Sequence, residues 1–585
     1  MEKKNIYKFP LYETRQITDL RDMLRGSVEL YSDKTAFLTK PKKGEPYVPI
    51  TYKQYGAHVD AFGSKLFEMG ITADRRVAIV AETRYEWYIS YLATVNGAAI
   101  IVPLDKELPA AEINLMLKRA DCDVVIYSPS LRDKVLEAAE GVESLKFFIL
   151  MDYYKNEVEP FTVQASKDNL PQEYSFRYLL AEGQELLDSG YRDFLDCQID
   201  PNEMRILLFT SGTTARSKAV MHSHHTISTN LIAMTEMIHI EDETALSVLP
   251  LHHTYECTCG FLCQIYKGST IAEAEGLRYI VDNLKESKTT LLLAVPLIFE
   301  AFHKRIWRTI DKQGKRKTVE FALKFTRALS KVGIDLRKTF FKDIHAALGG
   351  HMRLLIAGGA AIDPKVLEDF TDFGFIAVQG YGLTECGPIL ALNRDKYFQH
   401  KSAGLPLPRT EAEVVDPDKN GIGEFRSRGD NVMLGYYGDP ELTAEALQDG
   451  WFYTGDFGYI DQAGFLVITG RKKNVIVTKN GENVFPEEIE AVINRYDVVA
   501  ESVVSSVDGR QGDMDIVIEI YPDSEALQEH FGHKDYTDEE VLNLMKNLVK
   551  EFNDTQPLYK RIKNVSLRDE PFEKNTSKKI IRKYN

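Results

Sequence analysis

The chain has 585 residues, and its 72 basic and 87 acidic side chains give a formal net charge of −15. This length predicts more than one domain, because a single hydrophobic core seldom grows beyond about 250–300 residues. Hydrophobic residues at 44% and charged residues at 27% exclude a disordered, collagen-like or coiled-coil chain. The acidic balance argues against nucleic acid as a partner, since a phosphate backbone is bound by a basic face. A small anionic ligand remains compatible, because it needs only a few local donors.

The cysteines and the start of the chain bear on the cellular compartment. Six cysteines in 585 residues indicate no disulfide framework. The polar start, Met1-Glu2-Lys3-Lys4-Asn5, leads into no apolar signal core. The longest weakly polar stretch, residues 89–104, contains Asn96 and Pro103 and is shorter than the ~20 residues of a membrane span. We therefore expect a reduced, cytoplasmic protein without stable membrane insertion, whose contact with a membrane is at most peripheral.

The first half of the chain alternates helix and strand signals. Residues 57–70 predict an amphipathic helix that ends at a glycine. Short apolar runs at residues 76–80, 123–127 and 146–150 predict buried strands. This alternation is typical of parallel α/β layers.

The sequence texture changes in the second half. Residues 411–468 combine short strands with turns rich in Gly, Asp and Asn, which predicts a small antiparallel β unit. Beyond Gly470, signals for a helix at 487–495, a strand at 516–520 and a helix at 537–552 predict a separate α+β domain of ~115 residues. We therefore divide the chain into domains at residues 1–469 and 470–585.

Two clusters of residues could suggest binding sites, but we interpret both as structural. The basic run at residues 312–317 is interpreted as a solvated helix face or loop rather than a binding site. Two histidines and three cysteines between residues 252 and 263 raise the alternative of a zinc site. A single helix does not easily bring Cys257, Cys259 and Cys263 together, because they are spaced by two and four. Their neighbours are apolar, so we interpret them as small buried thiols.

A predicted strand at residues 206–209 leads into the first stretch that carries chemistry. This stretch reads Thr210-Ser211-Gly212-Thr213-Thr214-Ala215-Arg216-Ser217-Lys218. Its glycine lets the backbone come close, its hydroxyls and N–H groups donate, and its lysine adds charge, which together suit an oxyanion ligand. A surface turn rich in Ser and Thr is the alternative. The common nucleotide loop is excluded, because its second Gly followed by Lys and Ser or Thr is missing.

Further stretches carry groups that suit a nucleotide. Gln379-Gly380-Tyr381-Gly382-Leu383-Thr384-Glu385 combines a tight backbone, a flat ring for a purine, a hydroxyl donor and a hard oxygen ligand for Mg²⁺. Gly358-Gly359-Ala360 precedes it by about twenty residues. In Tyr453-Thr454-Gly455-Asp456, the carboxylate can accept both hydroxyls of a ribose. Gly470-Arg471-Lys472-Lys473 and the stretch from Asn575 to Arg582 are basic. Singly, each is more typical of a turn or a solvated tail.

In this order, the stretches resemble the adenylate-forming (AMP-binding) superfamily of acyl-CoA synthetases, luciferases and peptide-synthetase adenylation domains, over about residues 30–585. The family's phosphate loop reads Thr-Ser-Gly-Thr-Thr-Gly-x-Pro-Lys-Gly, and this chain departs from it at Ala215, Ser217 and Ala219. The resemblance implies a large N-terminal domain of two α/β subdomains plus a small β-barrel. It also implies a smaller, mobile α+β C-terminal domain that rotates between two half-reactions.

The resemblance implies a role for each candidate residue. The catalytic set is Lys579, Thr384, Glu385 and His253, with Glu385 as the Mg²⁺ ligand and His253 beside the acyl pocket. The ATP-binding set is Thr210, Ser211, Gly212, Thr213, Thr214, Lys218, Gly359, Ala360, Gln379, Gly380, Tyr381, Gly382, Asp456 and Arg471. Lys473 lies at the hinge and Gly481 belongs to the coenzyme A step. The family usually has Gly where this chain has Lys578, and the spacing to Ile580 and Arg582 favours Lys579 as the catalytic lysine.

The implied reaction has two steps. A carboxylate attacks the α-phosphate of ATP and gives an acyl-adenylate and pyrophosphate, and the thiol of coenzyme A then attacks the mixed anhydride. Amino-acid-activating relatives have an Asp where this chain has His253 or Thr254, so an α-amino acid is disfavoured, although Glu256 lies nearby. Residues 471–474 with 480–484 are most similar to the long-chain fatty acyl-CoA synthetase branch, so we expect a medium- or long-chain fatty acid as substrate.

Two alternatives stay open. One is a fatty acyl-AMP ligase that loads an acyl carrier protein instead of coenzyme A. The other is a non-catalytic nucleotide-binding homologue that kept the fold, which the departures from the phosphate-loop pattern keep in consideration.

Overall fold

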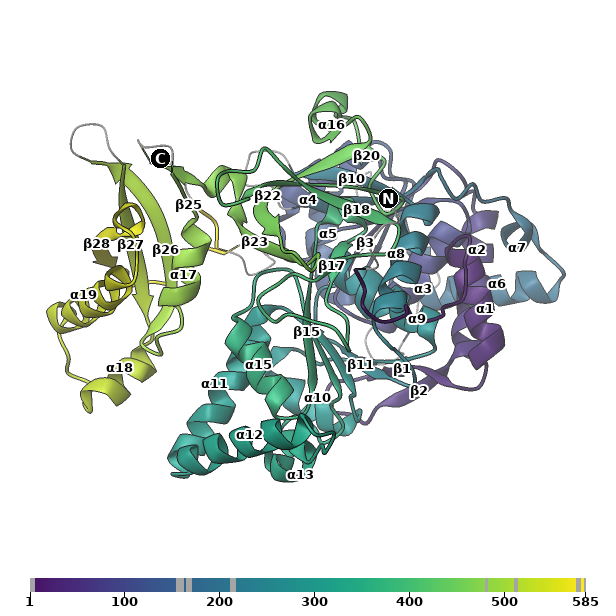
Figure 1. Ribbon diagram of the computed structural model, residues 1–585. Helices are drawn as coiled ribbons and strands as arrows, with labels where there is room; N and C mark the ends of the chain where they lie inside the picture. The colour runs from purple at the N-terminus through teal and green to yellow at the C-terminus, as the bar shows by residue number, and fades with distance from the viewer. Residues whose placement is uncertain are drawn as a thin grey trace.

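The computed structural model describes residues 6–153, 171–210, 217–478, 482–509, 514–574 and 580–582, and the backbone of 163–164. Figure 1 shows a large N-terminal body and a smaller C-terminal body, drawn in yellow-green at the left. The large body is built on two nine-stranded sheets and a five-stranded sheet, and the small one on a three-stranded sheet. The predicted α/β architecture, with a large N-terminal domain and a smaller C-terminal domain, is confirmed.

The first nine-stranded sheet holds one edge of the candidate site. Its order is β17-β16-β15-β14-β13-β11-β12-β1-β2, and the six strands from β15 to β1 are parallel to one another. The strands are β1 (Thr35–Thr39), β2 (Val48–Thr51), β11 (Thr244–Ser247), β12 (Thr270–Glu273), β13 (Leu291–Ala294), β14 (Leu354–Ala357), β15 (Ile376–Gly382), β16 (Ile389–Leu392) and β17 (Leu405–Pro406). Alternate residues face opposite sides, so Leu292 and Leu355 join one hydrophobic cluster while Leu291 and Leu354 join another.

The second nine-stranded sheet has the order β20-β10-β9-β4-β3-β5-β6-β8-β7. Its strands are β3 (Arg76–Val80), β4 (Ile100–Pro103), β5 (Val124–Tyr127), β6 (Phe147–Leu150), β7 (Val163–Gln164), β8 (Gln172–Ser175), β9 (Met204–Thr210), β10 (Lys218–Ser223) and β20 (Gly435–Tyr436). The four buried strands that the apolar runs predict are β3, β5, β6 and β9, and β3, β5 and β6 pair in parallel.

The helices cover these sheets (Figure 1). They are α1 (Leu20–Tyr31), α2 (Tyr52–Glu68), α3 (Tyr85–Asn96), α4 (Ala110–Ala120), α5 (Arg132–Ala138), α6 (Phe176–Asp188), α7 (Asp193–Asp196), α8 (His224–Met237), α9 (Cys263–Lys267), α10 (Ile280–Glu286), α11 (Pro296–Lys312), α12 (Arg316–Ser330), α13 (Arg337–Phe340), α14 (Lys342–Ala347), α15 (Pro364–Asp372) and α16 (Pro440–Ala446), with a π-helical segment η2 (Tyr255–Leu262). None of the helices in the described part of the chain combines the length and the apolar character needed to span a bilayer.

Helix α2 begins five residues before the prediction, at Tyr52 instead of residue 57. The Thr51 side chain accepts a hydrogen bond from the backbone N–H of Gln54, and the Gln54 side chain accepts one from the N–H of Thr51. This capping box satisfies two N–H groups that lack helical partners and so fixes the start of the helix. Gly70, with a φ of 82°, follows the end of the helix as predicted.

The predicted antiparallel β unit is a five-stranded sheet. It consists of β18 (Thr410–Val415), β19 (Gly423–Gly429), β21 (Leu447–Gln448), β22 (Trp451–Ile460) and β23 (Leu466–Arg471), all paired antiparallel. Within the described residues its pairings follow an open path, so closure into the small β-barrel stays a prediction.

The C-terminal part has a hydrophobic core of its own, which runs from Ile476 to Ile562. Its elements are β24 (Ile476–Val477), β25 (Asn483–Val484), α17 (Pro486–Ile493), β26 (Val499–Asp508), β27 (Met514–Pro522), α18 (Ser524–Phe531), α19 (Asp538–Asp554) and β28 (Ile562–Leu567). The boundary predicted at residues 469 and 470 falls inside β23, and its exact place stays a prediction.

Ion pairs connect the two bodies at α11 and α15. Their nitrogen–oxygen distances are 2.8 Å for Arg495 with Asp363, 3.0 Å for Lys304 with Asp523 and 3.3 Å for Arg308 with Glu525. Each pair contains at least one partly exposed side chain. Such pairs contribute about 0–1 kcal/mol each, so they hold the domains only weakly.

Candidate active site

A cavity of about 1670 Å³ lies along the carboxyl edge of the first sheet. The residues that directly follow β11, β13, β14 and β15 all line it, and they are Val248, Val295, Gly358 and Leu383. The carboxyl ends of parallel strands are the usual place for a ligand in an α/β sheet. The C-terminal part contributes to the wall as well, through Glu490, Val503, Ile580, Ile581 and Arg582.

Most of the predicted site residues that the structure describes line this cavity. They are Thr210, Lys218, His253, Gly359, Ala360, Gly380, Gly382, Thr384, Glu385, Arg471 and Lys473. Tyr381 and Asp456 connect to this wall through Arg471, and the Gln379 amide donates to the carbonyl of His400 at 2.6 Å. The predicted residues Ser211, Gly212, Thr213, Thr214, Gly481 and Lys579 lie outside the described residues.

The described residues next to the predicted phosphate loop and to Lys579 reach the cavity. Thr210 at the end of β9 pairs with Lys218 at the start of β10, and both line the cavity, so the predicted phosphate loop starts and ends at its wall. Ile580, which directly follows Lys579 in the sequence, also lines it.

The carboxylate of Glu385 is held by a residue that the sequence analysis missed. The Tyr436 hydroxyl donates to Glu385 Oε1 at 2.8 Å, and Lys218 Nζ donates to the Tyr436 oxygen at 3.3 Å. Strand β20 places Tyr436 there by pairing with Val220 on β10. The remaining oxygen of Glu385 has no hydrogen bond within the described residues. The only signal in the sequence was the turn Gly435-Tyr436-Tyr437-Gly438.

Asp456 is the centre of a second polar cluster. The Tyr381 hydroxyl donates to Asp456 Oδ2 at 2.6 Å, and Arg471 Nε lies 2.8 Å from Oδ1. Burial and the Asp456 carboxylate hold the pKa of Tyr381 well above its usual value, so the hydroxyl remains a donor. Tyr381, the predicted flat face for the purine, and Asp456, the predicted acceptor for the ribose, thus fix each other's side chains. Their roles toward a nucleotide stay predictions.

The cluster predicts a loss of nucleotide affinity on Asp456→Asn. The variant keeps the shape but removes the charge that Tyr381 and Arg471 share, and losing charge-assisted hydrogen bonds costs about 1.5–3 kcal/mol. We expect the KM for ATP to rise roughly 10–150-fold with a smaller change in kcat. Asp449→Asn, on an exposed turn with a φ of 52° that Asn tolerates, is the control. ATP dependence equal to that of the control would contradict the role of Asp456.

Thr384 is fixed from two sides. His222 Nε2 donates to the Thr384 carbonyl at 2.7 Å, and the hydroxyls of Thr254 and Thr384 are 3.2 Å apart. Burial lowers the pKa of His222 to about 4, so the imidazole is neutral at neutral pH. Gly382 allows the tight turn, because a Cβ there would lie 1.9 Å from the carbonyl oxygen of Pro388.

Five cations line the polar half of the cavity, together with the carboxylates of Glu385, Asp416, Glu424, Glu445, Glu487 and Glu490. Lys218 begins β10, Arg471 ends β23, Lys472 and Lys473 follow it directly, and Arg582 comes from the C-terminal part. Burial, followed by the charges of Arg471, Lys218 and Arg582, lowers the pKa of Lys473. Arg582 is anchored by Glu490 at 2.5 Å and by the carbonyl of Val504 at 3.1 Å. These cations can neutralise negative charge on a bound ligand.

The other half of the cavity is apolar. It is lined by residues of α8, the segment after it, η2, α9 and β16, namely Met234, Ile238, Ile240, Cys259, Cys263, Ile389 and Leu392. The prediction that Cys257, Cys259 and Cys263 are buried thiols is confirmed, because each side chain is buried. His253 lines the cavity beside this apolar half, and its role there stays a prediction.

Glu256 is the one acidic side chain that faces this half among the η2 residues. It is buried, and the Ser247 hydroxyl donates to its Oε1 at 2.5 Å. Burial raises the pKa of Glu256 to about 8, so the carboxyl is mostly protonated at neutral pH. A neutral carboxyl offers no counter-ion to a substrate ammonium group.

Glu256 therefore predicts a pH dependence of stability. The carboxyl ionises above about pH 4.3 in the unfolded chain but only near pH 8 in the native protein, so the unfolded state binds fewer protons in this window. The protonated Glu256 carboxyl therefore contributes to the free energy of unfolding at low pH. Between about pH 4.3 and pH 8 this contribution falls by about 1.4 kcal/mol for each pH unit. Glu256→Gln removes the effect, so its melting temperature relative to wild type should increase from about pH 5 to about pH 8. A difference that stays constant, as expected for exposed Glu320→Gln, would contradict it.

Comparison with known proteins agrees with this geometry. The family model described as AMP-binding enzyme matches residues 24–437, and that of the AMP-binding enzyme C-terminal domain matches residues 473–584. The chain belongs to the AMP-binding enzyme family. A human long-chain-fatty-acid–CoA ligase 6 is 30% identical over 489 residues, which cover 80% of this chain and 68% of that protein. An Arabidopsis thaliana chloroplastic long-chain-fatty-acid–[acyl-carrier-protein] ligase is 27% identical over 84% of this chain and 75% of its own.

A solved structure shows the same fold at lower identity. ATP-bound MatB from Rhodopseudomonas palustris superposes with a TM-score of 0.72 at 22% identity, and the match covers 96% of each chain. At this identity the likeness establishes the AMP-binding fold over both the large and the small domain.

Proposed function

We propose that this member of the AMP-binding family is an ATP-dependent acid–thiol ligase. It activates a medium- or long-chain fatty acid as an acyl-adenylate and transfers the acyl group to coenzyme A. The observation that carries the proposal is a single cavity with one charged, polar half that contains five cations and one apolar half, lined by the family's motif residues. A nucleotide and an acyl chain would meet where these halves join.

The cations of the polar half suit the ATP phosphates. Lys218 and Arg471 face this half, and Arg582 closes it from the C-terminal part. Asp456, which Tyr381 and Arg471 hold from behind this wall, would accept the ribose hydroxyls, and Gly359, with a φ of 82°, would present backbone to the adenine. These residues would bind and orient ATP before the chemical step.

The residues present also fit Mg²⁺. The described residues contain no group of three or more side chains that could hold a metal alone. Mg²⁺ is usually bound through one or two carboxylates, with water and substrate phosphates completing its shell. Glu385, oriented by Tyr436 at 2.8 Å and with one oxygen left for a ligand, supplies such a carboxylate. When bound, Mg²⁺ would neutralise phosphate charge.

The reaction needs no protein nucleophile. A carboxylate oxygen of the acid attacks the α-phosphorus, and the bond to the leaving pyrophosphate breaks. The thiolate of coenzyme A then attacks the acyl carbon, and AMP leaves with the oxygen that came from the acid. The chain's contribution is therefore positioning and charge neutralisation, which commonly dominate such transfers.

The apolar half supports a fatty acyl substrate. Its wall is made of aliphatic and sulfur-containing side chains, and its nearest carboxyl, Glu256, is neutral at neutral pH. An amino acid would leave its ammonium group without a partner charge, at a desolvation cost that a fatty acid avoids.

Met234 gives a direct test of where the acyl chain lies. It is buried on α8 and lines the apolar half, and its sulfur is 3.5 Å from that of Cys259. Met234→Trp should fill this space and lower turnover of long acids relative to short ones by about tenfold or more. The volume-conserving Met234→Leu should keep the wild-type preference. An unchanged preference in the folded Trp variant would place the chain elsewhere.

A panel of carboxylic acids tests the proposed function as a whole. Pyrophosphate release is measured for short, medium and long fatty acids and for amino acids, first without an acceptor and then with coenzyme A or with a phosphopantetheinylated acyl carrier protein. We expect release with medium- or long-chain acids and an acyl-CoA product in the mass spectrum. If a thioester forms only with the carrier protein, the acyl carrier protein is the acceptor instead of coenzyme A. Absence of acid-dependent release with every acid would overturn the ligase assignment.

A further inference from the structure

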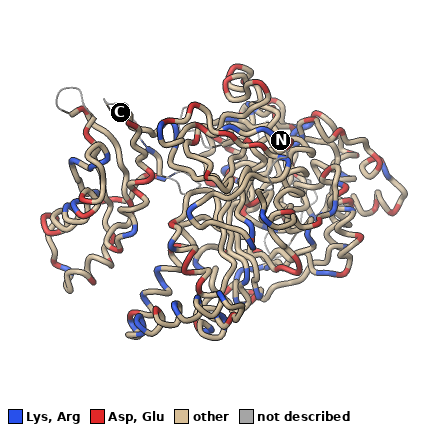
Figure 2. Tube along the Cα trace, in the orientation of Figure 1, with Lys and Arg blue, Asp and Glu red and all other residues tan. Residues whose placement is uncertain are grey.

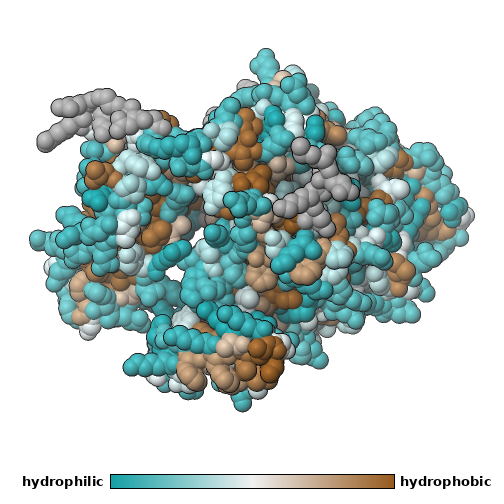
Figure 3. All heavy atoms as spheres, viewed as in Figure 1, coloured by the Kyte–Doolittle hydropathy of each residue, from teal (hydrophilic) through white to brown (hydrophobic). Residues whose placement is uncertain are grey.

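The segment from α12 to α13 exposes a group of large apolar side chains. Their exposed fractions are 71% for Phe321, 43% for Phe325, 71% for Val332, 48% for Ile334, 38% for Leu336 and 48% for Phe340. Phe321 and Phe325 stack with ring centroids 6.4 Å apart, and Phe325 is 5.8 Å from Phe340. Figure 3 shows the group as a brown cluster at the lower tip of the molecule. A contiguous patch of this kind marks an interaction surface.

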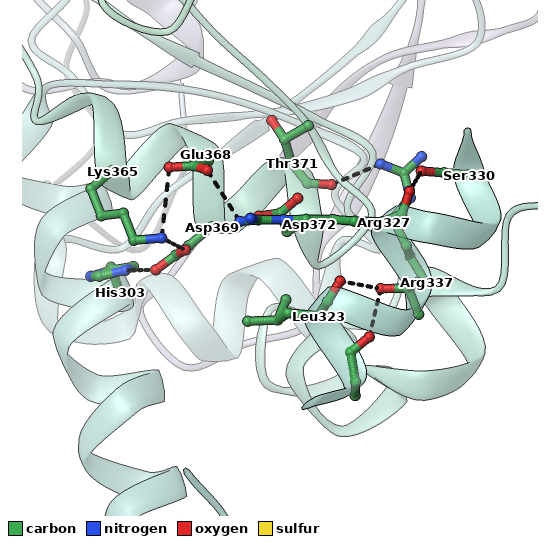
Figure 4. A network of polar contacts seen from close by, with 12 residues as sticks. His303, Leu323, Arg327, Ser330, Arg337, Lys365, Glu368, Asp369, Thr371 and Asp372 are labelled. Atoms are coloured by element: carbon green, nitrogen blue, oxygen red, sulfur yellow. Dashed lines mark hydrogen bonds and ion pairs between the residues drawn. The ribbon is translucent and has the colours of Figure 1, made fainter. Parts of the chain in front are cut away.

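The patch is not the result of a loosely placed helix. The opposite side of α12 faces the body of the domain, where Leu323 is buried in the hydrophobic cluster that also contains residues of α11 and α15. Arg327 forms ion pairs with Glu368 and Asp372, and Arg337 donates to the carbonyl of Thr371 at 2.9 Å (Figure 4). These contacts hold α12 and α13 on α15. The rings of Phe321 and Phe325, four residues apart on the outward side, therefore form a second apolar stripe that stays partly exposed in the described structure.

The same segment is strongly basic in an acidic protein. Residues 311–343 contain ten Lys and Arg against four Asp and Glu, a net charge of +6, whereas the whole chain carries −15. Figure 2 shows this concentration of blue at the lower tip. No ion pair within 4.0 Å joins any described residue to the lysines of this segment, which are Lys312, Lys315, Lys317, Lys324, Lys331, Lys338 and Lys342.

We propose that this α12–α13 surface docks the protein on an anionic phospholipid bilayer. The aromatic and aliphatic side chains would enter the interface, and the lysines would meet the lipid phosphates. Membrane binding of this type commonly needs both an apolar insertion and a polybasic patch, and here the two coincide. A protein partner could also cover the apolar side chains, but the seven lysines beside them, which form no ion pair with any described residue, match the negative charge of an anionic bilayer surface better.

The position of the surface relative to the cavity adds a consequence that rests on the proposed function. Helix α11 begins at the cavity wall, where Pro296 and the half-exposed Leu297 line it, and ends at Lys312 beside the patch. Seventeen helical residues span about 25 Å. Docking would therefore hold the cavity within about this distance of a bilayer in which fatty acids dissolve.

Vesicle co-sedimentation tests the proposal without depending on catalysis. The full chain is mixed with vesicles of phosphatidylcholine alone or of phosphatidylcholine and phosphatidylglycerol in equal parts. We expect binding to the anionic vesicles that falls at least tenfold at high salt or on phosphatidylcholine alone. Lys317→Gln/Lys324→Gln/Lys331→Gln should lower the partition coefficient about 10²-fold, because each lysine near such a surface contributes about fivefold. Phe321→Ser/Phe325→Ser should lower it about tenfold or more.

Three controls show whether a loss of vesicle binding comes from the patch itself and not from misfolding or from a damaged active site. Leu115→Ser replaces a residue that is 66% exposed on α4, away from the patch, and should bind vesicles like wild type. The patch variants should keep the wild-type melting temperature and the wild-type turnover of a medium-chain acid supplied in solution without vesicles. Equal vesicle binding by the patch variants and Leu115→Ser would overturn the proposal. The proposal would also be overturned if the wild-type protein does not bind anionic vesicles and instead forms a dimer that is dissociated by Phe321→Ser/Phe325→Ser.

Discussion

Glu385→Gln is expected to lower kcat/KM for magnesium-ATP by at least about 10²-fold. The variant keeps the hydrogen bond from Tyr436 but loses the negative charge, and metal stabilisation of a transferring phosphoryl group supplies several kcal/mol. The loss should shrink as the Mg²⁺ concentration rises, because the weakened step is metal binding to the enzyme–nucleotide complex. Titration with Mn²⁺ followed by electron paramagnetic resonance in the presence of ATP measures that affinity apart from turnover.

Glu424→Gln is the matched control for Glu385. Glu424 lines the same cavity, but its carboxylate is paired with Lys472 at 2.7 Å. We expect this variant to keep the wild-type Mg²⁺ dependence. If Glu385→Gln shows the same metal affinity and turnover as this control in a folded protein, the assignment of Glu385 as the metal ligand is wrong.

Lys579→Ala and Gly481→Leu are expected to separate the two half-reactions. Lys579 should neutralise the α-phosphate only while the adenylate forms, and loss of one such donor costs about 10²–10³ in rate. The variant should still convert supplied acyl-adenylate to thioester. Gly481 should lie on the path of the coenzyme A thiol after domain rotation, so a leucine there should let the adenylate form and then stall. Single-turnover assays of each half-reaction measure both effects.

The structure is compatible with such a rotation. The C-terminal part has its own core from Ile476 to Ile562, so it can move as a unit. The ion pairs of Arg495, Lys304 and Arg308 that connect it to the large body are partly exposed and weak. Lys578→Ala is the control, with nearly wild-type activity if Lys579 is the catalytic lysine. If only Lys578→Ala loses adenylation, the catalytic lysine is Lys578 instead of Lys579. If Lys579→Ala and Gly481→Leu each lose both half-reactions equally, the domain does not rotate between them as proposed.

The fold could be predicted where local patterns and tertiary structure agree. The strands β3, β5, β6 and β9 appear as short apolar runs because both faces of a parallel sheet are buried. The start of α2 was missed because its capping box, Thr51 with Gln54, precedes the amphipathic pattern. Gly359 and Glu385 follow the ends of β14 and β15, which share one edge of the first sheet, whereas Asp456 lies within β22 and Arg471 ends β23 of another sheet. The resemblance to the family's motifs, not strand position, therefore brought them to one predicted site.

Other parts of the site depend on contacts that no local pattern contains. Tyr436 reaches Glu385 only because the two-residue strand β20 pairs with β10, more than two hundred residues earlier in the chain. The protonation of Glu256 depends on its complete burial beside Ser247, which periodicity does not reveal. The basic run at residues 312–317 was correctly interpreted as solvated, but its meaning changes beside the exposed rings of Phe321 and Phe325. The net charge of the whole chain, −15, does not reveal that residues 311–343 carry a net positive charge.

The central claim is that a carboxylate of the substrate attacks the α-phosphorus of ATP and that the resulting adenylate gives up its acyl group to a thiol. A fatty acid labelled with oxygen-18 in its carboxyl group tests this directly, with ATP, Mg²⁺ and coenzyme A and the products read by mass spectrometry. With both carboxyl oxygens labelled, the account predicts AMP that carries one oxygen-18 atom, acyl-CoA that keeps the other in its thioester carbonyl, and unlabelled pyrophosphate. Unlabelled AMP, or ADP with the label in phosphate, would contradict it.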